Sequence, residues 1–395
     1  MTYDFDKVID RHGTNSVKYD ICKDTEVIPM WVADMDFQAA PFILDALRRR
    51  IDHGIFGYTW PSDRYYQATI DWFSGRRGWK PEKEWFRPIS GIVPAISIAI
   101  EALTEADEKV IFQGPAYNCF YSCVRNNRRT LLENRLVYDN AAEDPSFTID
   151  FEDFERKCAD PKATLFILCN PHNPSGRIWT REELSRMGEI ALRHGVTVVS
   201  DEIHCELEMP GHTYTPFASI CPEFEDNCVT FVSPSKSFNL AGLEIANIIT
   251  KDPVKRDKIM KVIDWWEHCD VNQIGVVALE AAYSDEGAEW LHQLCGYVHE
   301  NYLVLKDSLK TVPEVKLCKL EGTYLTWIDC HALTAKGITT KEAQDSLMKM
   351  EKVWINSGTM YGDGDFMRVN LACPRATMQE GARRIAAGLR RLLDQ

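Results

Sequence analysis

The sequence lacks several features that would each point to a familiar class of protein. No apolar run approaches the roughly 20 residues that a membrane-spanning helix needs. Residues 1–11 are polar and charged, so we expect no secretory signal. No two cysteines stand at a CxxC spacing, and cysteine and histidine do not cluster as zinc ligands do. These absences argue against a membrane protein, a secreted protein and a zinc module.

Basic side chains are also scarce relative to acidic ones. The chain has 45 Lys and Arg against 59 Asp and Glu, which gives a formal net charge of −14. A nucleic-acid partner calls for a basic face, so we expect none. The 13 cysteines are scattered, and disulfide-dense chains are mostly small and secreted. We therefore predict buried thiols in a cytoplasmic protein.

The pattern of apolar residues predicts two domains. At 395 residues the chain is too long for one small core. Buried strands alternate with amphipathic helices up to about residue 285, which is typical of an α/β domain with a mainly parallel sheet. A long helix, short strands and further helices then indicate an α+β domain. We predict an N-terminal arm with part of the small domain at 1–49, a large α/β domain at 50–285 and a small C-terminal domain at 286–395.

Polar residues follow several of the expected strands. We expect buried strands at 109–112, 163–169, 196–200 and 228–232, and helices at 95–103, 181–194, 289–309 and 378–393. Asn173, Asp201, His204 and Lys236 come at or just after the carboxyl ends of three of these strands. Functional groups of an open α/β sheet belong at this edge.

Lys236 is a candidate nucleophile. A lysine at the mouth of a buried strand is partly desolvated, which lowers its pKa and frees the amine as a nucleophile for Schiff-base chemistry. Taken alone, a solvated loop lysine is the commoner explanation. The turn at 91–94 precedes a helical run and offers free backbone N–H groups to a phosphate. It has neither GxGxxG nor Walker spacing, so its signal alone is weak.

Four separated features occur in a telling order: the turn at 91–94, Asn-Pro-His-Asn-Pro-Ser-Gly at 170–176, Asp201, and Ser-Pro-Ser-Lys at 233–236. Together they resemble the fold type I pyridoxal-phosphate enzymes, the aspartate aminotransferase superfamily, over nearly the whole chain. The segments 31–37, 201–204 and 235–243 are most similar to the MalY/PatB group of carbon–sulfur β-lyases. The resemblance implies an α/β, fold type I architecture with pyridoxal 5'-phosphate as the cofactor.

The resemblance also implies the central roles in the site. Lys236 would hold the cofactor as a Schiff base and then act as the base at Cα. Asp201 would pair with the pyridinium nitrogen, Asn173 would donate to the phenolic oxygen, and Arg368 would bind the substrate carboxylate. Plainer explanations are a helix cap for Asp201, a turn residue for Asn173 and a salt bridge for Arg368.

Further residues would complete the cofactor site. Tyr117 would stack on the ring, and Tyr58 would reach the phosphate of the neighbouring subunit, which implies a homodimer with shared sites. The phosphate would be held by the backbone N–H groups of Ile92 and Val93 and the hydroxyls of Ser233 and Ser235. The alternatives are ordinary packing for the two tyrosines and a helix cap for Ser235.

Two positions depart from the aminotransferase pattern. His204 stands where aminotransferases carry a tyrosine, and the MalY/PatB group also has histidine here, although a structural histidine is an alternative. Glu244 stands where many superfamily members carry an arginine that binds the phosphate. Phosphate binding is then left to the helix dipole and hydroxyl groups.

The sequence therefore predicts a cytoplasmic, homodimeric carbon–sulfur β-lyase. Cystathionine or another S-substituted cysteine would give pyruvate, ammonia and a thiol. The first alternative is a class I/II aminotransferase that uses the same residues with a keto acid. The second is a protein of this fold with an added regulatory binding role. Asp34 and Tyr324 are guesses for residues that contact the substrate side chain.

Overall fold

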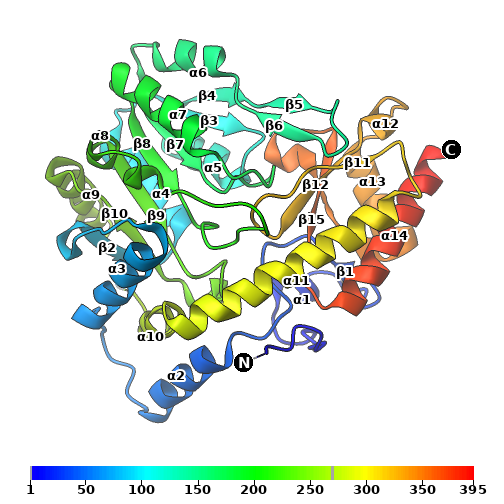
Figure 1. The fold of residues 1–395 in the computed structure, drawn as a ribbon, viewed down its shortest axis with the longest axis horizontal. Coiled ribbons are helices and arrows are strands. Elements are labelled where there is room, and N and C mark those ends of the chain that lie inside the picture. Colours follow the sequence, from blue (N-terminus) through cyan, green and yellow to red (C-terminus); the bar gives the residue numbers. More distant parts are fainter. Residues whose placement is uncertain (1, 268–270) are drawn as a thin grey trace.

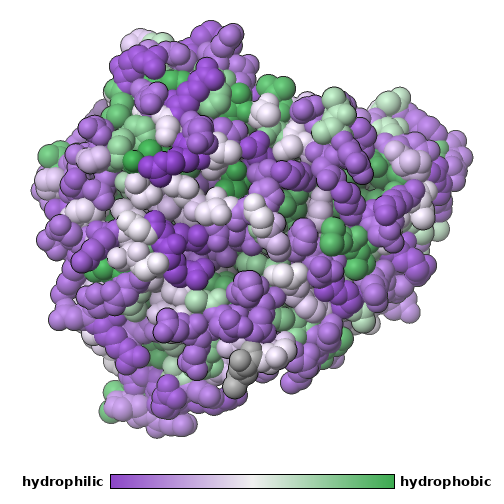
Figure 2. All heavy atoms as spheres, in the orientation of Figure 1, coloured by the Kyte–Doolittle hydropathy of each residue, from purple (hydrophilic) through white to green (hydrophobic). Residues whose placement is uncertain are grey.

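The structure, a computed structural model, describes residues 2–267 and 271–395. A seven-stranded sheet and a four-stranded sheet organise the fold, and the long helix α11 passes beneath both in the view of Figure 1. No helix of the described residues is long and apolar enough to cross a membrane. The face shown in Figure 2 is largely hydrophilic, with apolar side chains scattered over it.

The large sheet has the order β2-β10-β9-β8-β7-β3-β4. Strands β4, β3, β7, β8 and β9 are parallel, whereas β10 is antiparallel to both of its neighbours. Its strands are β2 (Phe86–Ile89), β3 (Lys109–Gly114), β4 (Thr130–Arg135), β7 (Ala163–Cys169), β8 (Thr197–Asp201), β9 (Cys228–Val232) and β10 (Ala246–Ile249).

Helices cover both faces of this sheet, which explains why its strands are apolar almost throughout. Within β7, Leu165 and Ile167 join one buried core, whereas Phe166 and Leu168 join the other. The first core contains α4 (Ile92–Leu103), α5 (Asn118–Asn126) and α9 (Pro253–Trp265). The second contains α3 (Asp63–Arg77), α6 (Phe151–Cys158), α7 (Arg181–Arg193), α8 (Pro222–Asp226) and α10 (Gln273–Ala282).

The small sheet is antiparallel, in the order β11-β12-β15-β14. Its strands are β11 (Lys316–Leu317), β12 (Leu325–Asp329), β14 (Asn356–Ser357) and β15 (Phe366–Asn370), and its helices are α11 (Asp285–Leu309), α12 (His331–Thr334), α13 (Thr340–Ser346) and α14 (Arg375–Leu393). Helices α11 and α14 pack against each other. A separate hairpin joins β5 (Val137–Asp139) to β6 (Ser146–Thr148).

The N-terminal residues reach back to the C-terminal part of the chain. Strand β1 (Ile28–Pro29) pairs in parallel with β13 (Val353–Trp354), after the short helix α1 (Val17–Asp20). Helix α2 (Pro41–Asp52) then packs on α10. The segment between β1 and α2 therefore lies where both sheets can be reached.

The predicted mainly parallel sheet is confirmed, as are the buried strands at 163–169 and 228–232. The antiparallel direction of β10 was not anticipated. Helix α4 begins at Ile92, three residues before the predicted start, so Ile92 and Val93 lie in its first turn. The predicted domain boundaries stay a prediction. The cysteines of the described residues are free thiols, and Cys269 lies outside those residues.

Candidate active site

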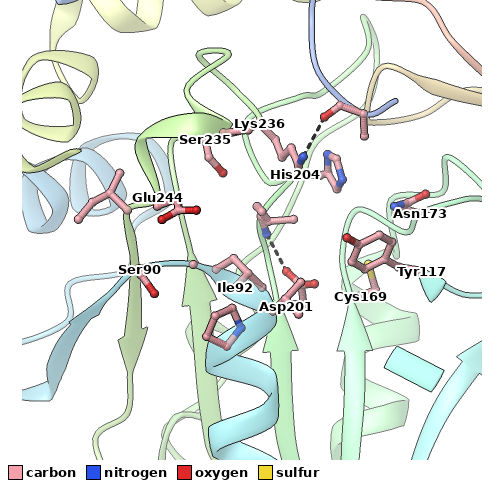
Figure 3. A pocket seen from close by; sticks show the side chains of 17 residues that line it. Ser90, Ile92, Tyr117, Cys169, Asn173, Asp201, His204, Ser235, Lys236 and Glu244 are labelled. Atoms are coloured by element: carbon pink, nitrogen blue, oxygen red, sulfur yellow. Dashed lines mark hydrogen bonds between the residues drawn. The ribbon is translucent and has the colours of Figure 1, made fainter. Parts of the chain in front are cut away.

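A cavity of about 430 Å³ opens at the edge where the parallel strands of the large sheet end. Figure 3 shows its side chains standing above the ends of the strands and the start of α4. Eight of the predicted site residues line it: Ile92, Val93, Tyr117, Asn173, Asp201, His204, Ser235 and Lys236. Its size suits a small organic ligand.

The amine of Lys236 projects into this cavity. Its Nζ donates a hydrogen bond to the main-chain oxygen of Ala33 at 2.8 Å (Figure 3). Burial lowers the pKa of Lys236, and the positive charge of Arg368 lowers it further, against the opposing effect of Asp34 and Asp201. A larger fraction of the amine is therefore neutral than in a solvated lysine, as a nucleophile or a base requires.

Asp201 is the last residue of β8 and lies on the floor of the cavity. It is almost fully buried and accepts a hydrogen bond from the backbone N–H of Ile203 at 3.2 Å. Burial raises its pKa to about 7, although the hydrogen bond from Ile203 and the charge of Lys236 act in the other direction. A buried carboxylate of this kind calls for a positively charged partner.

Arg368 approaches from the small sheet. It lies in β15, its guanidinium stacks over the ring of Tyr361 at 4.5 Å, and its Nη1 donates to Asn173 Oδ1 at 3.1 Å. Its Nη2 donates to the main-chain oxygen of Trp31 at 3.0 Å, whereas its buried Nε has no partner. Although Arg368 does not itself line the cavity, it contacts Asn173, which does.

Two uncharged rings complete the walls. His204 is buried, and burial lowers its pKa to about 3 with a smaller effect from Lys236 and Arg368. Its Nδ1 is buried without a hydrogen-bond partner. Tyr117, at the start of α5, also lines the cavity, and burial raises the pKa of its hydroxyl, which keeps it protonated.

The opposite end of the cavity contains neutral donors together with the carboxylate of Glu244. The first turn of α4 presents Ile92 and Val93 there, after Gly91, and Ser235 stands nearby. Ser233 does not line the cavity, and its predicted contact with the phosphate stays a prediction. Its hydroxyl donates to Ile245 O and accepts from the backbone N–H of Ser235, so it shapes the loop.

Tyr58 does not reach the cavity of its own chain. Its side chain is fully exposed, next to exposed Phe56 and near exposed Trp60. A contact with a neighbouring subunit thus stays a prediction.

The segment 31–37, which we call the strap, contributes mainly through its backbone. The carbonyl of Ala33 accepts from Lys236 and also from the hydroxyl of Tyr324, at 2.9 Å. Further strap carbonyls accept from Arg368, Asn370 and Asn239. On the outer side, Arg11 and the buried Lys18 bind the carboxylates of Asp34 and Asp36. Tyr324 thus orients a carbonyl, and Asp34 is occupied by Arg11.

Comparisons with known proteins agree with this geometry. Residues 25–385 match the family model for aminotransferase class I and II. The chain belongs to this family. It is 46% identical to cystathionine β-lyase PatB of Bacillus subtilis (strain 168), over 98% of this chain and 99% of that protein. It is 30% identical to protein MalY of Escherichia coli (strain K12), over 96% and 97%. Cystalysin from Treponema denticola, whose crystal structure contains pyridoxal 5'-phosphate, superposes with a TM-score of 0.94 at 33% identity, over 99% of this chain and all of that one.

The aminotransferase family is pyridoxal-phosphate dependent, and the predicted fold type I architecture and cofactor are confirmed. The residues present fit the group. Among the described residues, no cationic group lies within hydrogen-bonding distance of the buried carboxylate of Asp201, and none is a hydrogen-bond partner of the buried His204 Nδ1. Lys236 stands above them with a lowered pKa, and a helix N-terminus lies at the far end of the same cavity.

Proposed function

We propose that the protein is a pyridoxal-phosphate-dependent carbon–sulfur β-lyase. Its substrate would be cystathionine or a related S-substituted cysteine, and its products pyruvate, ammonia and a thiol. The observation that carries the proposal is the near full-length similarity, at 46% identity, to a cystathionine β-lyase. The cavity supports it, because a lysine of lowered pKa and a buried carboxylate line it, and an arginine with an unpartnered Nε contacts Asn173 in its wall.

Each residue has a task that its surroundings favour. Bound pyridoxal phosphate supplies a carbonyl carbon for amines and a ring that withdraws electrons from Cα. Asp201 would hold the ring nitrogen in its protonated form, and Arg368 would bind the substrate carboxylate through its unpartnered Nε. Lys236 would take the Cα proton, after which the carbonyl of Ala33 would receive the resulting ammonium.

Water exclusion would follow from the same arrangement. The strap covers Lys236 on the side of Ala33, while His204 and Tyr117 present rings that stay uncharged. His204 and Tyr117 are uncharged, so this wall would give the leaving thiolate less electrostatic stabilisation than a cation would. The thiol then leaves with a proton from solvent, and hydrolysis gives pyruvate and ammonia.

The second candidate is an aminotransferase, favoured by the family model that matches residues 25–385. It would use the same residues but would require a keto acid as amino-group acceptor. The deciding experiment incubates the cofactor-loaded protein with cystathionine and no keto acid, and follows pyruvate and free thiol together. Equal release of both over many turnovers is expected. Turnover only after a keto acid is added would establish the aminotransferase instead.

We further propose a cytoplasmic homodimer with shared sites. The exposed loop side chains of Phe56, Tyr58 and Trp60 support a subunit contact, because clustered exposed aromatics mark interaction surfaces. Tyr58 would then act at the phosphate of the other subunit. The many scattered thiols support the cytoplasm, because cytoplasmic proteins keep their cysteines reduced.

A further inference from the structure

The phosphate end of the cavity contains an acidic side chain. Glu244 lines the cavity together with Gly91, Ile92, Val93 and Ser235. Figure 3 shows its carboxylate pointing into the cavity, on the side where Ser235 and Ile92 lie. The residue follows a single helical turn, Ala241–Leu243, and adopts a left-handed backbone conformation with φ of 48° and ψ of 65°. This turn directs the side chain inward instead of along strand β10.

The carboxylate of Glu244 is not neutralised within the described part of the chain. Its side chain forms no hydrogen bond or ion pair there, and only its main-chain oxygen accepts, from Asn272 at 3.5 Å. Lys236 is the single basic side chain among the described residues that line the cavity, and its amine is bound to Ala33 O. The other groups near Glu244 are neutral backbone and hydroxyl donors.

We propose that Glu244 sets the affinity for the cofactor by repelling its phosphate dianion. The proposal rests on the placement of the phosphate at the first turn of α4. A helix N-terminus offers the equivalent of about half a positive charge, which a nearby full negative charge outweighs. Glu244 thus makes cofactor binding weaker than the donors alone would allow. The enzyme becomes active in proportion to the cofactor supply.

The test measures binding of pyridoxal phosphate to cofactor-free protein, by the absorbance of the bound form, so it does not depend on lyase activity. Glu244→Gln keeps the size of the side chain and the cost of its left-handed backbone, and removes only the charge. We expect this variant to bind pyridoxal phosphate about tenfold more tightly at low salt. The difference in affinity between Glu244→Gln and the wild type should decrease at about 1 M salt, where exposed charges are screened.

Two controls isolate the phosphate. Pyridoxal, which lacks it, should bind the wild type and Glu244→Gln equally. Glu152→Gln removes an exposed charge that does not line the cavity and should leave both affinities unchanged. Equal or weaker binding of pyridoxal phosphate to Glu244→Gln would overturn the proposal, and so would an equal gain for pyridoxal. Failure of the lyase assay with these results intact would refute the proposed reaction and leave the role of Glu244 standing.

Discussion

Lys236 and Asp201 share one cavity, and burial shifts both toward their neutral forms. The pKa of the amine falls, and that of the carboxyl group rises to about 7. Neutral Lys236 is the form that the proposed reaction requires, whereas neutral Asp201 is unsuited to hold a protonated ring nitrogen. The positive ring nitrogen would itself stabilise the carboxylate. We therefore expect cofactor binding to shift Asp201 to its ionised form and to leave Lys236 neutral and reactive.

The raised pKa of Asp201 has a measurable consequence for the cofactor-free protein. An unfolded Asp has a pKa near 3.9, so between about pH 4 and pH 7 the folded state binds more protons than the unfolded state. The stabilisation is fully present below this window and is lost as the pH rises through it. Asp201→Asn should remove this pH-dependent loss in the free energy of unfolding, which is on the order of a few kcal/mol.

Thermal unfolding at pH 5 to 8 measures this difference. The wild type should lose stability with rising pH more steeply than Asp201→Asn, and exposed Asp52→Asn should follow the wild type. Burial also raises the pKa of Glu202 to about 7, and the charge of Asp201 raises it further, so Asp201→Asn also reduces the pH-dependent loss that Glu202 contributes. Parallel curves for the wild type and Asp201→Asn would contradict the assigned shift.

The second single-residue prediction concerns Arg368. Lysine keeps the charge but has no Nε donor and no planar fork, so Arg368→Lys should lose most of its grip on a carboxylate. We expect KM for an S-substituted cysteine to rise about a hundredfold, with a smaller effect on kcat. A substrate analogue without the carboxylate serves as control ligand and should bind both proteins equally. Similar weakening of both ligands would mean that Arg368 only supports Asn173.

At the level of helices and strands, the sequence predicts the positions of the elements better than it predicts the directions of the strands. Strands β7 and β9 are uniformly apolar because both faces of the sheet are covered, and this pattern is visible in the sequence. Strand β10 is equally buried, although it contains Asn247, and its composition says nothing about its direction. Its connection from β9 contains only one short helical turn, too little for the crossover that a parallel neighbour needs.

The site also contains residues that could be predicted from the sequence and residues that could not. Asn173, Asp201, His204 and Lys236 could be predicted because parallel strands bring their carboxyl ends to one edge. The hydroxyl of Ser233 could not, since its orientation depends on how the loop folds back to Ile245. The carbonyl of Ala33 has no signature at all, because every residue carries one. Asn370 could have been predicted as a site residue, because it lies two residues after Arg368 and therefore on the same face of β15.

Helix α11 offers a matched pair of glycines. A Cβ on Gly287 would lie 1.9 Å from the backbone oxygen of Ala282, whereas a Cβ on Gly296 would meet nothing within 4 Å. Gly287→Ala should therefore destabilise the protein by about 2 kcal/mol or more. Gly296→Ala should stabilise it by about 0.5–1 kcal/mol through helix propensity. Denaturant unfolding checks both, and loss of stability in both variants would show that the helix tolerates neither.

For the whole molecule, shared sites predict complementation between two defective subunits. Lys236→Ala should abolish activity, and Tyr58→Phe should weaken cofactor retention. A mixed dimer contains one site that combines native Lys236 of one subunit with native Tyr58 of the other. Purified mixed dimers carrying two different affinity tags should therefore recover about half of the wild-type activity at limiting cofactor. If Tyr58 served its own subunit, the mixture would never exceed the Tyr58→Phe homodimer.

The strap also ties the site to the order in which the chain is made. Residues 31–37 are synthesised before the residues that donate to their carbonyls, which are Lys236, Tyr324, Arg368 and Asn370. Buried carbonyl groups need such partners. A nascent chain can therefore form the large sheet while part of its strap is still exposed to solvent. Only when β15 has emerged can the strap and β15 close together over Lys236, the proposed catalytic lysine.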